Sequence, residues 1–213
     1  MALIESRILT DHVYDKIRLM IEDGALKPGS KINKRELEVA LGVSQTPIND
    51  ALSRLSGQKI IEQRSRRGYF VRDYSCKELI DIFAARAAVE GMAARLCVEN
   101  ATDEEIDEIT ALFAGVSFPM DENAYHAYEL NDRTFHSRVI RYSRNQMIAE
   151  MNEQFGYIVK AATKGLIRPP EDTIDEHRAL IAALRARNAR LAGELMTEHH
   201  MNSREVLLRS CAD

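Results

Sequence analysis

The chain has 213 residues, which is enough for one large domain or two small ones. Hydrophobic residues make up 45% and charged residues 29%, a composition typical of a protein with an apolar core. No run approaches the ~18 consecutive apolar residues of a membrane-spanning helix. The first residues, MALIESR, lack the basic start and apolar run of a signal peptide. We therefore expect a cytoplasmic protein that makes no contact with a membrane.

The cysteines fit the same expectation. The chain has three of them, Cys76, Cys97 and Cys211, which is an odd number, and they are widely spaced. Disulfide frameworks are typical of small secreted chains with an even number of cysteines. We expect all three side chains to be reduced thiols.

Charge is divided unevenly along the chain. In residues 1–74, 13 basic against 10 acidic residues give +3, whereas in residues 75–213, 16 against 23 give −7. Clustered positive charge favours contact with nucleic acid. The division predicts that any such contact is made by the N-terminal part.

The first predicted element is a helix from about Ser6 to Asp23. Its apolar residues recur on one helix face, at Val13, Ile17, Met20 and Ile21. Gly24 closes the helix. The following LKPGS segment contains a proline, which cannot continue a helix, and is predicted to be a turn.

The stretch from Asn33 to Leu55 is predicted to form two helices joined by a tight turn. Apolar residues recur at helical spacing, at Leu37, Ala40 and Leu41 and again at Ile48, Ala51, Leu52 and Leu55. Gly42 ends the first helix, and Thr46 is the expected N-cap of the second, with Pro47 at its first position. Gln45, Asn49 and Ser53 then face outward, as expected of a helix that enters a DNA major groove. The alternative is an ordinary helical hairpin.

A small basic hairpin is predicted next. β-branched and aromatic residues flank the segment Ser65-Arg66-Arg67-Gly68, and Arg64 precedes it. Three helices followed by a basic hairpin make a winged helix–turn–helix domain, here residues 1–74. The wing arginines would hold phosphates or reach the minor groove. A solvated charged loop is the alternative.

The segments LKPGSKINKREL, LGVSQTPINDAL and IIEQRSRRGYFV resemble the N-terminal domain of GntR-family transcription regulators. The resemblance covers about residues 6–73 and implies binding to double-stranded operator DNA. It places the DNA contacts on the second helix, the turn, the third helix and the wing, at Arg35, Ser44, Gln45, Thr46, Asn49, Arg64, Arg66, Arg67 and Gly68.

The chain departs from the family pattern at its reading positions. The family has arginine where this chain has Gln45 and Asn49, and glutamate where it has Asp50. Arginine pairs with guanine, whereas glutamine and asparagine pair with adenine. We expect adenine to replace guanine at the positions read by residues 45 and 49. The loss of two cations should also weaken the salt dependence, leaving Arg35 and the wing arginines to carry more of it.

The C-terminal part, residues 75–213, is predicted to be an all-α bundle of six helices. The predicted helices cover residues 76–98, 103–115, 121–142, 145–164, 173–187 and 189–208. Ser75 with Glu78, and Thr102 with Glu105, have the spacing of capping boxes. No strand pattern occurs in this part.

Four polar residues in the bundle have spacings that suit a shared site. Asp132 and His136 are four residues apart, and His177 and His199 each lie 11 residues from Asn188. If Asn188 makes a tight turn between two helices, both imidazoles lie level on adjacent helices, roughly 16 Å from the turn. One carboxylate and three imidazoles suit a divalent metal. A metal-free polar network is the alternative, and His12, His126 and His200 are expected to be ordinary surface or core histidines.

The segments DRTFHSRV, DEHRALIAAL and LMTEHH resemble the FCD subfamily of GntR regulators, whose C-terminal domain is a helical effector-binding bundle. The resemblance implies that Asp132, His136, His177 and His199 bind a divalent metal, with zinc first and nickel possible. The family often has Gly-Asp at the last helix turn, where this chain has Arg187-Asn188. Asparagine tolerates left-handed backbone, so the turn is still expected.

Arg86 and Glu90 lie on an otherwise apolar helix stripe. Two buried charges are costly unless they are paired or face a polar ligand. The planar guanidinium of Arg86 matches a carboxylate, and an arginine on this helix commonly lines the pocket of the subfamily. We expect Arg86 and Glu90 to take part in effector binding, and an internal Arg86–Glu90 pair is the alternative.

Together, these features predict a homodimeric, ligand-responsive transcription regulator that binds operator DNA and a small carboxylate effector. One alternative is a metal-dependent hydrolytic enzyme, since an open metal site can activate water. No general base supports it, because Glu176 is adjacent to His177 and neighbouring helical residues point to different faces. A DNA-binding protein whose bundle serves only dimerisation is the other alternative.

Overall fold

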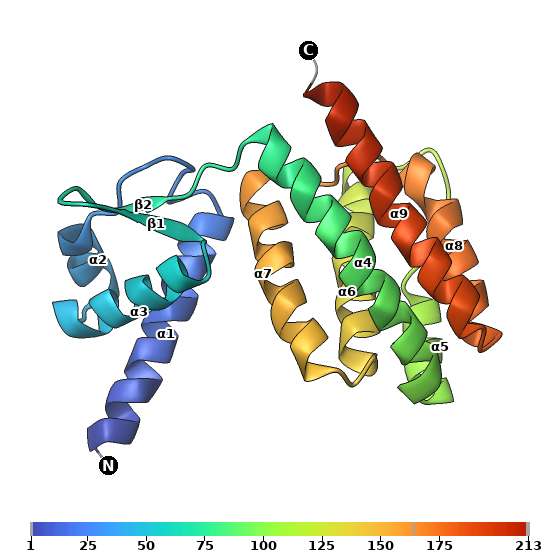
Figure 1. The fold of residues 1–213 in the computed structure, drawn as a ribbon, viewed down its shortest axis with the longest axis horizontal. Coiled ribbons are helices and arrows are strands. Elements are labelled where there is room, and N and C mark those ends of the chain that lie inside the picture. Colours follow the sequence, from blue (N-terminus) through green and yellow to red (C-terminus); the bar gives the residue numbers. More distant parts are fainter. Residues whose placement is uncertain (1, 164, 212–213) are drawn as a thin grey trace. The chain divides into compact units, whose positions relative to one another are not determined.

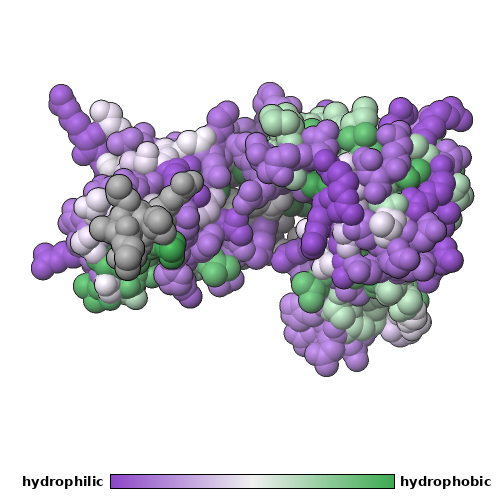
Figure 2. All heavy atoms as spheres, turned by 90° about the horizontal axis from the view of Figure 1, so that it is seen from below, coloured by the Kyte–Doolittle hydropathy of each residue, from purple (hydrophilic) through white to green (hydrophobic). Residues whose placement is uncertain are grey.

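The computed structural model describes residues 2–163 and 165–211, and most of them are helical. The chain forms two compact units, one of Met1–Tyr74 with Gly156–Lys164 and one of Ser75–Phe155 with Gly165–Asp213. The segment 156–164, expected in the C-terminal domain from its position in the sequence, groups with the first unit. Figure 2 shows a face on which hydrophilic residues predominate and hydrophobic residues form only small groups. Within the described ranges, no helix is long and apolar enough to cross a membrane.

Residues 2–74 of the first unit form three helices and a two-stranded antiparallel sheet (Figure 1). These elements are α1 (Ala2–Glu22), α2 (Lys34–Leu41), α3 (Gln45–Gly57), β1 (Ile61–Arg64) and β2 (Gly68–Val71). Ile17, Ile48, Leu52 and Leu55 are fully buried and form the centre of its core. The expected winged helix–turn–helix is confirmed.

Helix α3 begins two residues earlier than expected. Ser44 is its N-cap, with extended backbone at φ −75° and ψ 171°, and the helix starts at Gln45. The prediction of Thr46 as N-cap and Pro47 as first residue is wrong. Proline is tolerated at the third position because the first N–H groups of a helix have no partner inside the helix. The end of α2 is as predicted, since Gly42 takes the left-handed conformation at φ 67°.

The hairpin that follows α3 has the predicted form. Ile61 pairs with Val71 and Arg64 with Gly68, so Ser65, Arg66 and Arg67 make the turn. The reversal is tight, with the Arg67 N–H donating to the carbonyl of Arg64 at 3.0 Å. The two arginines therefore lie at the exposed tip of the wing.

The second unit is built mainly from six helices, as predicted. They are α4 (Cys76–Asn100), α5 (Asp103–Ala111), α6 (Glu122–Tyr142), α7 (Gln146–Ala162), α8 (Pro170–Arg185) and α9 (Ala189–Ser210). Both predicted capping boxes are present, at Ser75 and Thr102. Helix α8 starts three residues earlier than expected because Pro170 occupies its first position, where the missing N–H costs no hydrogen bond.

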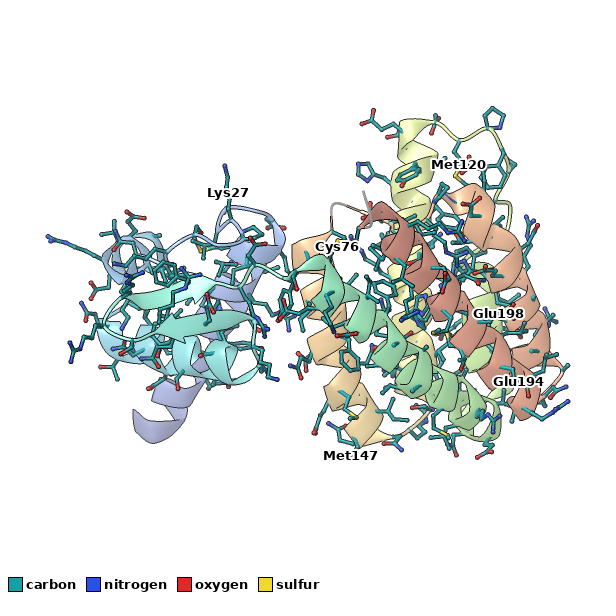
Figure 3. The ribbon with its side chains drawn as sticks, turned by 45° about the horizontal axis from the view of Figure 1, so that its top comes forward. Lys27, Cys76, Met120, Met147, Glu194 and Glu198 are labelled. Atoms are coloured by element: carbon teal, nitrogen blue, oxygen red, sulfur yellow. A yellow bond between two sulfur atoms is a disulfide. The ribbon has the colours of Figure 1, made fainter. Side chains whose placement is uncertain are left out.

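Helices α4 and α9 run antiparallel, side by side (Figure 1). They approach closely at Gly91, where a Cβ atom would lie 3.2 Å from the carbonyl oxygen of Gly193. The start of α4 therefore meets the end of α9, and Cys76 forms a disulfide with Cys211 (Figure 3). The expectation of three reduced thiols is wrong for this pair, because a separation of 135 residues gives no sign that two helix ends meet. Cys97 is free and buried.

The turn between α8 and α9 differs from expectation in one residue. Arg187, with φ 52°, takes the left-handed conformation that was expected of Asn188. Asn188 instead caps α9, its side-chain oxygen accepting the N–H of Leu191 at 3.1 Å. Arg187 is held there because its guanidinium donates to the carbonyls of Val98 (3.0 Å) and Ala101 (2.7 Å). The tight turn itself, which the histidine spacing requires, is present.

Candidate functional site

Three helices of the bundle bring Asp132, His136, His177 and His199 together. Asp132 and His136 come from α6, His177 from α8 and His199 from α9. Each offers one ligand atom, and these atoms all lie within 4.8 Å of one another. The ring centroids of His177 and His199 are 4.8 Å apart, so these two residues do lie level across the α8–α9 turn.

Each imidazole is held through its Nδ1 atom. That of His136 lies 2.7 Å from Glu90 Oε2, that of His177 lies 2.9 Å from the Tyr128 hydroxyl, and that of His199 lies 2.7 Å from Glu176 Oε2. The arrangement leaves the three Nε2 atoms for the shared site.

The Nε2 atom of His177 makes no hydrogen bond of normal geometry within the described residues. It is buried and lies 3.3 Å from Asp132 Oδ1, without hydrogen-bond geometry. Histidines that bind metals commonly use one ring nitrogen and anchor the other through a carboxylate or another polar group. The four residues therefore fit a cation, which would satisfy the unpartnered nitrogen.

The protonation states suit ligands. Burial lowers the pKa of His199 to about 3, against the opposing hydrogen bond to Glu176, and burial also lowers the pKa of His177. Burial acts to raise the pKa of Asp132, but its contact with His177 and the nearby imidazoles bring that pKa well below its usual range. Near pH 7, Asp132 is ionised and His177 and His199 are neutral, the forms that bind metals.

Sequence reasoning missed the residues that anchor these imidazoles. Glu176 was expected to point away from His177, and it does, but it points to α9, where it contacts His199. Arg168 forms an ion pair with Glu176, and Asn202 Nδ2 donates to Glu176 Oε1 at 2.8 Å. Glu176 is therefore fully engaged and not free as a general base. Helical spacing offers one signal for such partners, since Tyr128 lies four residues before Asp132.

Arg86 and Glu90 form the internal pair that the sequence left open. Arg86 Nε donates to Glu90 Oε1 at 2.8 Å, and the Glu90 side chain is completely buried. Burial acts to raise the pKa of Glu90, but Arg86, His200 and His136 bring it well below its usual range. His200 was expected to be a surface or core histidine outside any site. It is buried, and its Nε2 atom lies 2.9 Å from Glu90 Oε2.

Glu90, His136 and His200 make a second group with spacing that could hold a cation. Here the charge of Glu90 is already balanced by Arg86, which would repel a second positive charge. The role that the contacts support for Glu90 is to orient His136 and Arg86.

The residues expected to contact DNA lie on exposed parts of the first unit. Arg35, Ser44, Gln45 and Thr46 are exposed at the turn and helix starts, and Asn49 is half-buried on α3. Ser44 makes no side-chain capping bond, so its hydroxyl is available to a ligand.

The wing residues differ in how freely they can meet a partner. Arg66 and Arg67 are exposed, and neither side chain has a partner within the described residues. Arg64 is less free, because its Nε donates to Glu62 Oε1 at 2.7 Å and its guanidinium lies over the Phe70 ring. Gly68, at φ 96°, shapes the turn by its backbone.

A winged helix–turn–helix unit followed by a helical unit with a buried polar centre is the architecture of a DNA-binding regulator with a second, all-helical domain. Comparison with known families agrees. Residues 9–71 match the bacterial regulatory proteins of the gntR family, and residues 81–202 match the FCD domain. The chain belongs to the gntR family and carries an FCD domain. It is a transcription regulator and not an enzyme.

Curated relatives extend over most of the chain. The probable D-xylose utilization operon transcriptional repressor of Paenarthrobacter nicotinovorans is 27% identical over 195 residues, covering 90% of this chain and 85% of the relative. The transcriptional repressor GlaR of Escherichia coli K12 is 26% identical over 200 residues, covering 89% and 91%. The solved structure of E. coli McbR/YncC has a TM-score of 0.73 at 24% identity, covering 95% of this chain and 98% of that one, and supports the fold.

Proposed function

We propose that this regulator responds to a small organic acid bound at a metal ion in its helical unit. Asp132, His136, His177 and His199 would hold the metal, with zinc first and nickel second. The protein would bind a near-palindromic operator as a homodimer, through one α3 helix from each subunit. Its place of action would be the cytoplasm.

The observation that carries the metal proposal is the anchoring of three imidazoles through Nδ1. Glu90, Tyr128 and Glu176 hold the rings, so the Nε2 atoms converge with the Asp132 carboxylate. The buried Nε2 atom of His177 faces Asp132 Oδ1 at 3.3 Å without a hydrogen bond of normal geometry, which supports a cation shared between the two groups. Three nitrogens and one oxygen suit zinc or nickel better than magnesium or calcium.

A metal bound here would act as a Lewis acid that accepts an oxygen atom of the effector carboxylate. The protein would hold the four metal-binding side chains in one geometry and would supply a positive charge to pair with the effector carboxylate. Arg86 is the candidate for a second contact with the effector, because part of its guanidinium is not used by Glu90. Glu90 would serve by positioning Arg86, since its own carboxylate is enclosed by three side chains.

An effector can change operator binding only if it prefers one arrangement of the protein over another. We propose that its binding at the metal favours one spacing of the two DNA-binding units in the dimer. The same linkage makes operator binding alter the effector's affinity by an equal factor.

The test combines metal content with DNA binding. The purified full-length protein is analysed for metals by mass spectrometry, beside His177→Ala and the exposed control His126→Ala. We expect a first-row metal near one per chain in the wild type and control, and loss of it in His177→Ala. An equal metal content in all three proteins would contradict the site.

The regulatory part is tested by fluorescence anisotropy with DNA from beside the protein's own gene. Small organic acids are added with and without a chelator, and sequence-selective, salt-sensitive binding that changes only with metal and acid together is expected. Operator binding that no acid alters, in a protein that dimerises normally, would favour a purely structural bundle.

A further inference from the structure

Lys34 lies at the reading surface of the DNA-binding unit, although neither the sequence pattern nor the family resemblance assigned it a role. It is the first residue of α2, and its Nζ lies 2.6 Å from Asn49 Oδ1 on α3. Its ammonium group also lies 5.2 Å from the centre of the Tyr69 ring on β2. Within the described ranges, no carboxylate forms an ion pair with Lys34. A cation is therefore held beside a residue expected to read bases.

The contact fixes how Asn49 can be used. An ammonium group can only donate hydrogen bonds, so the amide must turn its oxygen toward Lys34. The NH₂ group of the amide remains for another partner. An asparagine that reads adenine needs both ends of its amide, the oxygen for N6 and the NH₂ group for N7. The bond to Lys34 uses one of the two lone pairs of Asn49 Oδ1, and the ammonium group brings two further N–H donors to the same place, so donors outnumber acceptors here.

We propose that Lys34 and Asn49 act as one donor-rich, positively charged unit that selects guanine at the operator position read by residue 49. Guanine presents two adjacent acceptors, N7 and O6, in the major groove, and adenine presents an acceptor and a donor. Thymine offers one acceptor and a methyl group. This inference rests on operator binding through α3 and replaces the expectation of adenine at this position. The family has an arginine where this chain has Asn49. In this chain, Lys34 would supply the positive charge at that place.

Gln45, one turn earlier on α3, provides an internal contrast. Its Nε2 donates to Glu38 Oε2 at 3.3 Å, which uses one amide N–H and leaves the second N–H and the oxygen available. Glu38 adds further acceptors and no donor. Gln45 therefore keeps both a donor and an acceptor, and the position that it reads should keep adenine. The two reading positions differ because a cation lies beside the amide of Asn49 and a carboxylate beside that of Gln45.

The test begins with selection of operator sites from random DNA by the full-length wild-type protein. Duplexes that differ only at the base read by residue 49 are then compared by anisotropy at one salt concentration. We expect guanine to be preferred over adenine by about 10-fold or more, the range for a good two-donor contact. Replacing this guanine by 7-deazaguanine, which lacks the N7 acceptor, should weaken binding to the wild type.

Variants separate base reading from general charge. Lys34→Met frees the oxygen of Asn49 and should shift the preference from guanine toward adenine. The matched control is Lys27→Met, which removes a lysine that projects from the turn after α1 (Figure 3). The control should leave the base preference unchanged. Lys34→Arg keeps the donors and should keep guanine.

Several outcomes would overturn the proposal. Selection of adenine by the wild type, no effect of 7-deazaguanine, or an unchanged guanine preference in Lys34→Met would each do so. If Lys34→Met keeps the guanine preference but shows a weaker salt dependence of binding, Lys34 contacts a phosphate and does not read a base. The 7-deazaguanine comparison needs no variant, so it decides even if Lys34→Met does not fold. Absence of any sequence-selective DNA binding would instead count against the operator binding on which the inference rests.

Discussion

The two units treat their functional polar side chains in opposite ways. On the DNA-binding unit, Arg35, Arg66 and Arg67 are exposed, and within the described residues their charges have no partner. In the helical unit, Glu90 and His177 are completely buried and are held by contacts from neighbouring helices. DNA brings its own negative charge, so a side chain that meets it needs little support. A small ligand brings few contacts, so its site must be positioned in advance.

The difference predicts where substitutions act. Loss of an exposed cation should change DNA binding and leave the fold intact. Loss of a member of the buried network leaves an uncompensated charge or polar group in the interior, and should change the stability of the unit as well.

The largest effect is expected at Glu90. Glu90→Ala leaves Arg86 buried without its counter-charge and should lower the free energy of unfolding by about 3–5 kcal/mol. Urea unfolding followed by circular dichroism measures it. A control lies on the same helix with the same spacing, the exposed pair of Lys77 and Asp81. Asp81→Ala should leave the midpoint unchanged, and equal effects of the two substitutions would remove the contrast between the units.

Reduction of the Cys76–Cys211 disulfide should have the next largest effect. The bond closes a loop of more than 100 residues, so its loss should destabilise the helical unit by about 2–4 kcal/mol. Residues 1–74 contain no cysteine, so operator affinity under native conditions should not change. Urea unfolding with and without reductant tests the first point and anisotropy the second. Cys76→Ser should unfold like the reduced wild type and should not respond to reductant.

A third effect should appear on acidification in the presence of a chelator. Unfolded histidines take up a proton near pH 6.5, whereas burial keeps the pKa of His199 at about 3 and that of His200 at about 4. Between these values the unfolded chain binds more protons, so stability is complete above pH 6.5 and falls as the pH is lowered. At pH 5 the loss should be on the order of 2 kcal/mol for one such histidine. An unfolding midpoint in urea that is the same at pH 7 and pH 5 would contradict the predicted loss of stability.

Much of the fold follows from local patterns in the sequence. Apolar spacing located the helices, and Ser75 and Thr102 marked two of their starts through capping boxes. The convergence of His177 and His199 also followed from the sequence, because equal distances from one turn place two residues level on a helical hairpin.

The supporting contacts could not be predicted in this way. Glu90 reaches His136 across 46 residues and Tyr128 reaches His177 across 49, and both contacts depend on how separate helices pack. The Lys34–Asn49 contact depends on the angle at which α2 meets α3, and the disulfide on the length of α9 relative to α4. Sequence spacing along one helix carries no information about these distances.

The smallest effect is expected on the wing, where two arginines differ in how they are held. Arg67 has no side-chain partner within the described residues, whereas Arg64 is paired with Glu62 and stacked on Phe70. If Arg67 contacts a phosphate, Arg67→Gln should weaken binding similarly for all sequences and reduce the slope of log affinity against log salt by about 1. Arg64→Gln should change the slope less, because Glu62 already balances part of its charge.

Anisotropy titrations over a range of salt concentrations compare these two variants with the wild type. An unchanged slope in Arg67→Gln would show that the exposed wing tip does not meet the DNA backbone. A larger change in Arg64→Gln would mean that the Glu62 pair opens on binding and that Arg64 makes the stronger contact. In that case Arg64, a cation held by neighbouring side chains, would make the main DNA contact of the wing, as proposed for Lys34. The two units would then differ in the burial of their functional side chains and not in whether these are held by neighbours.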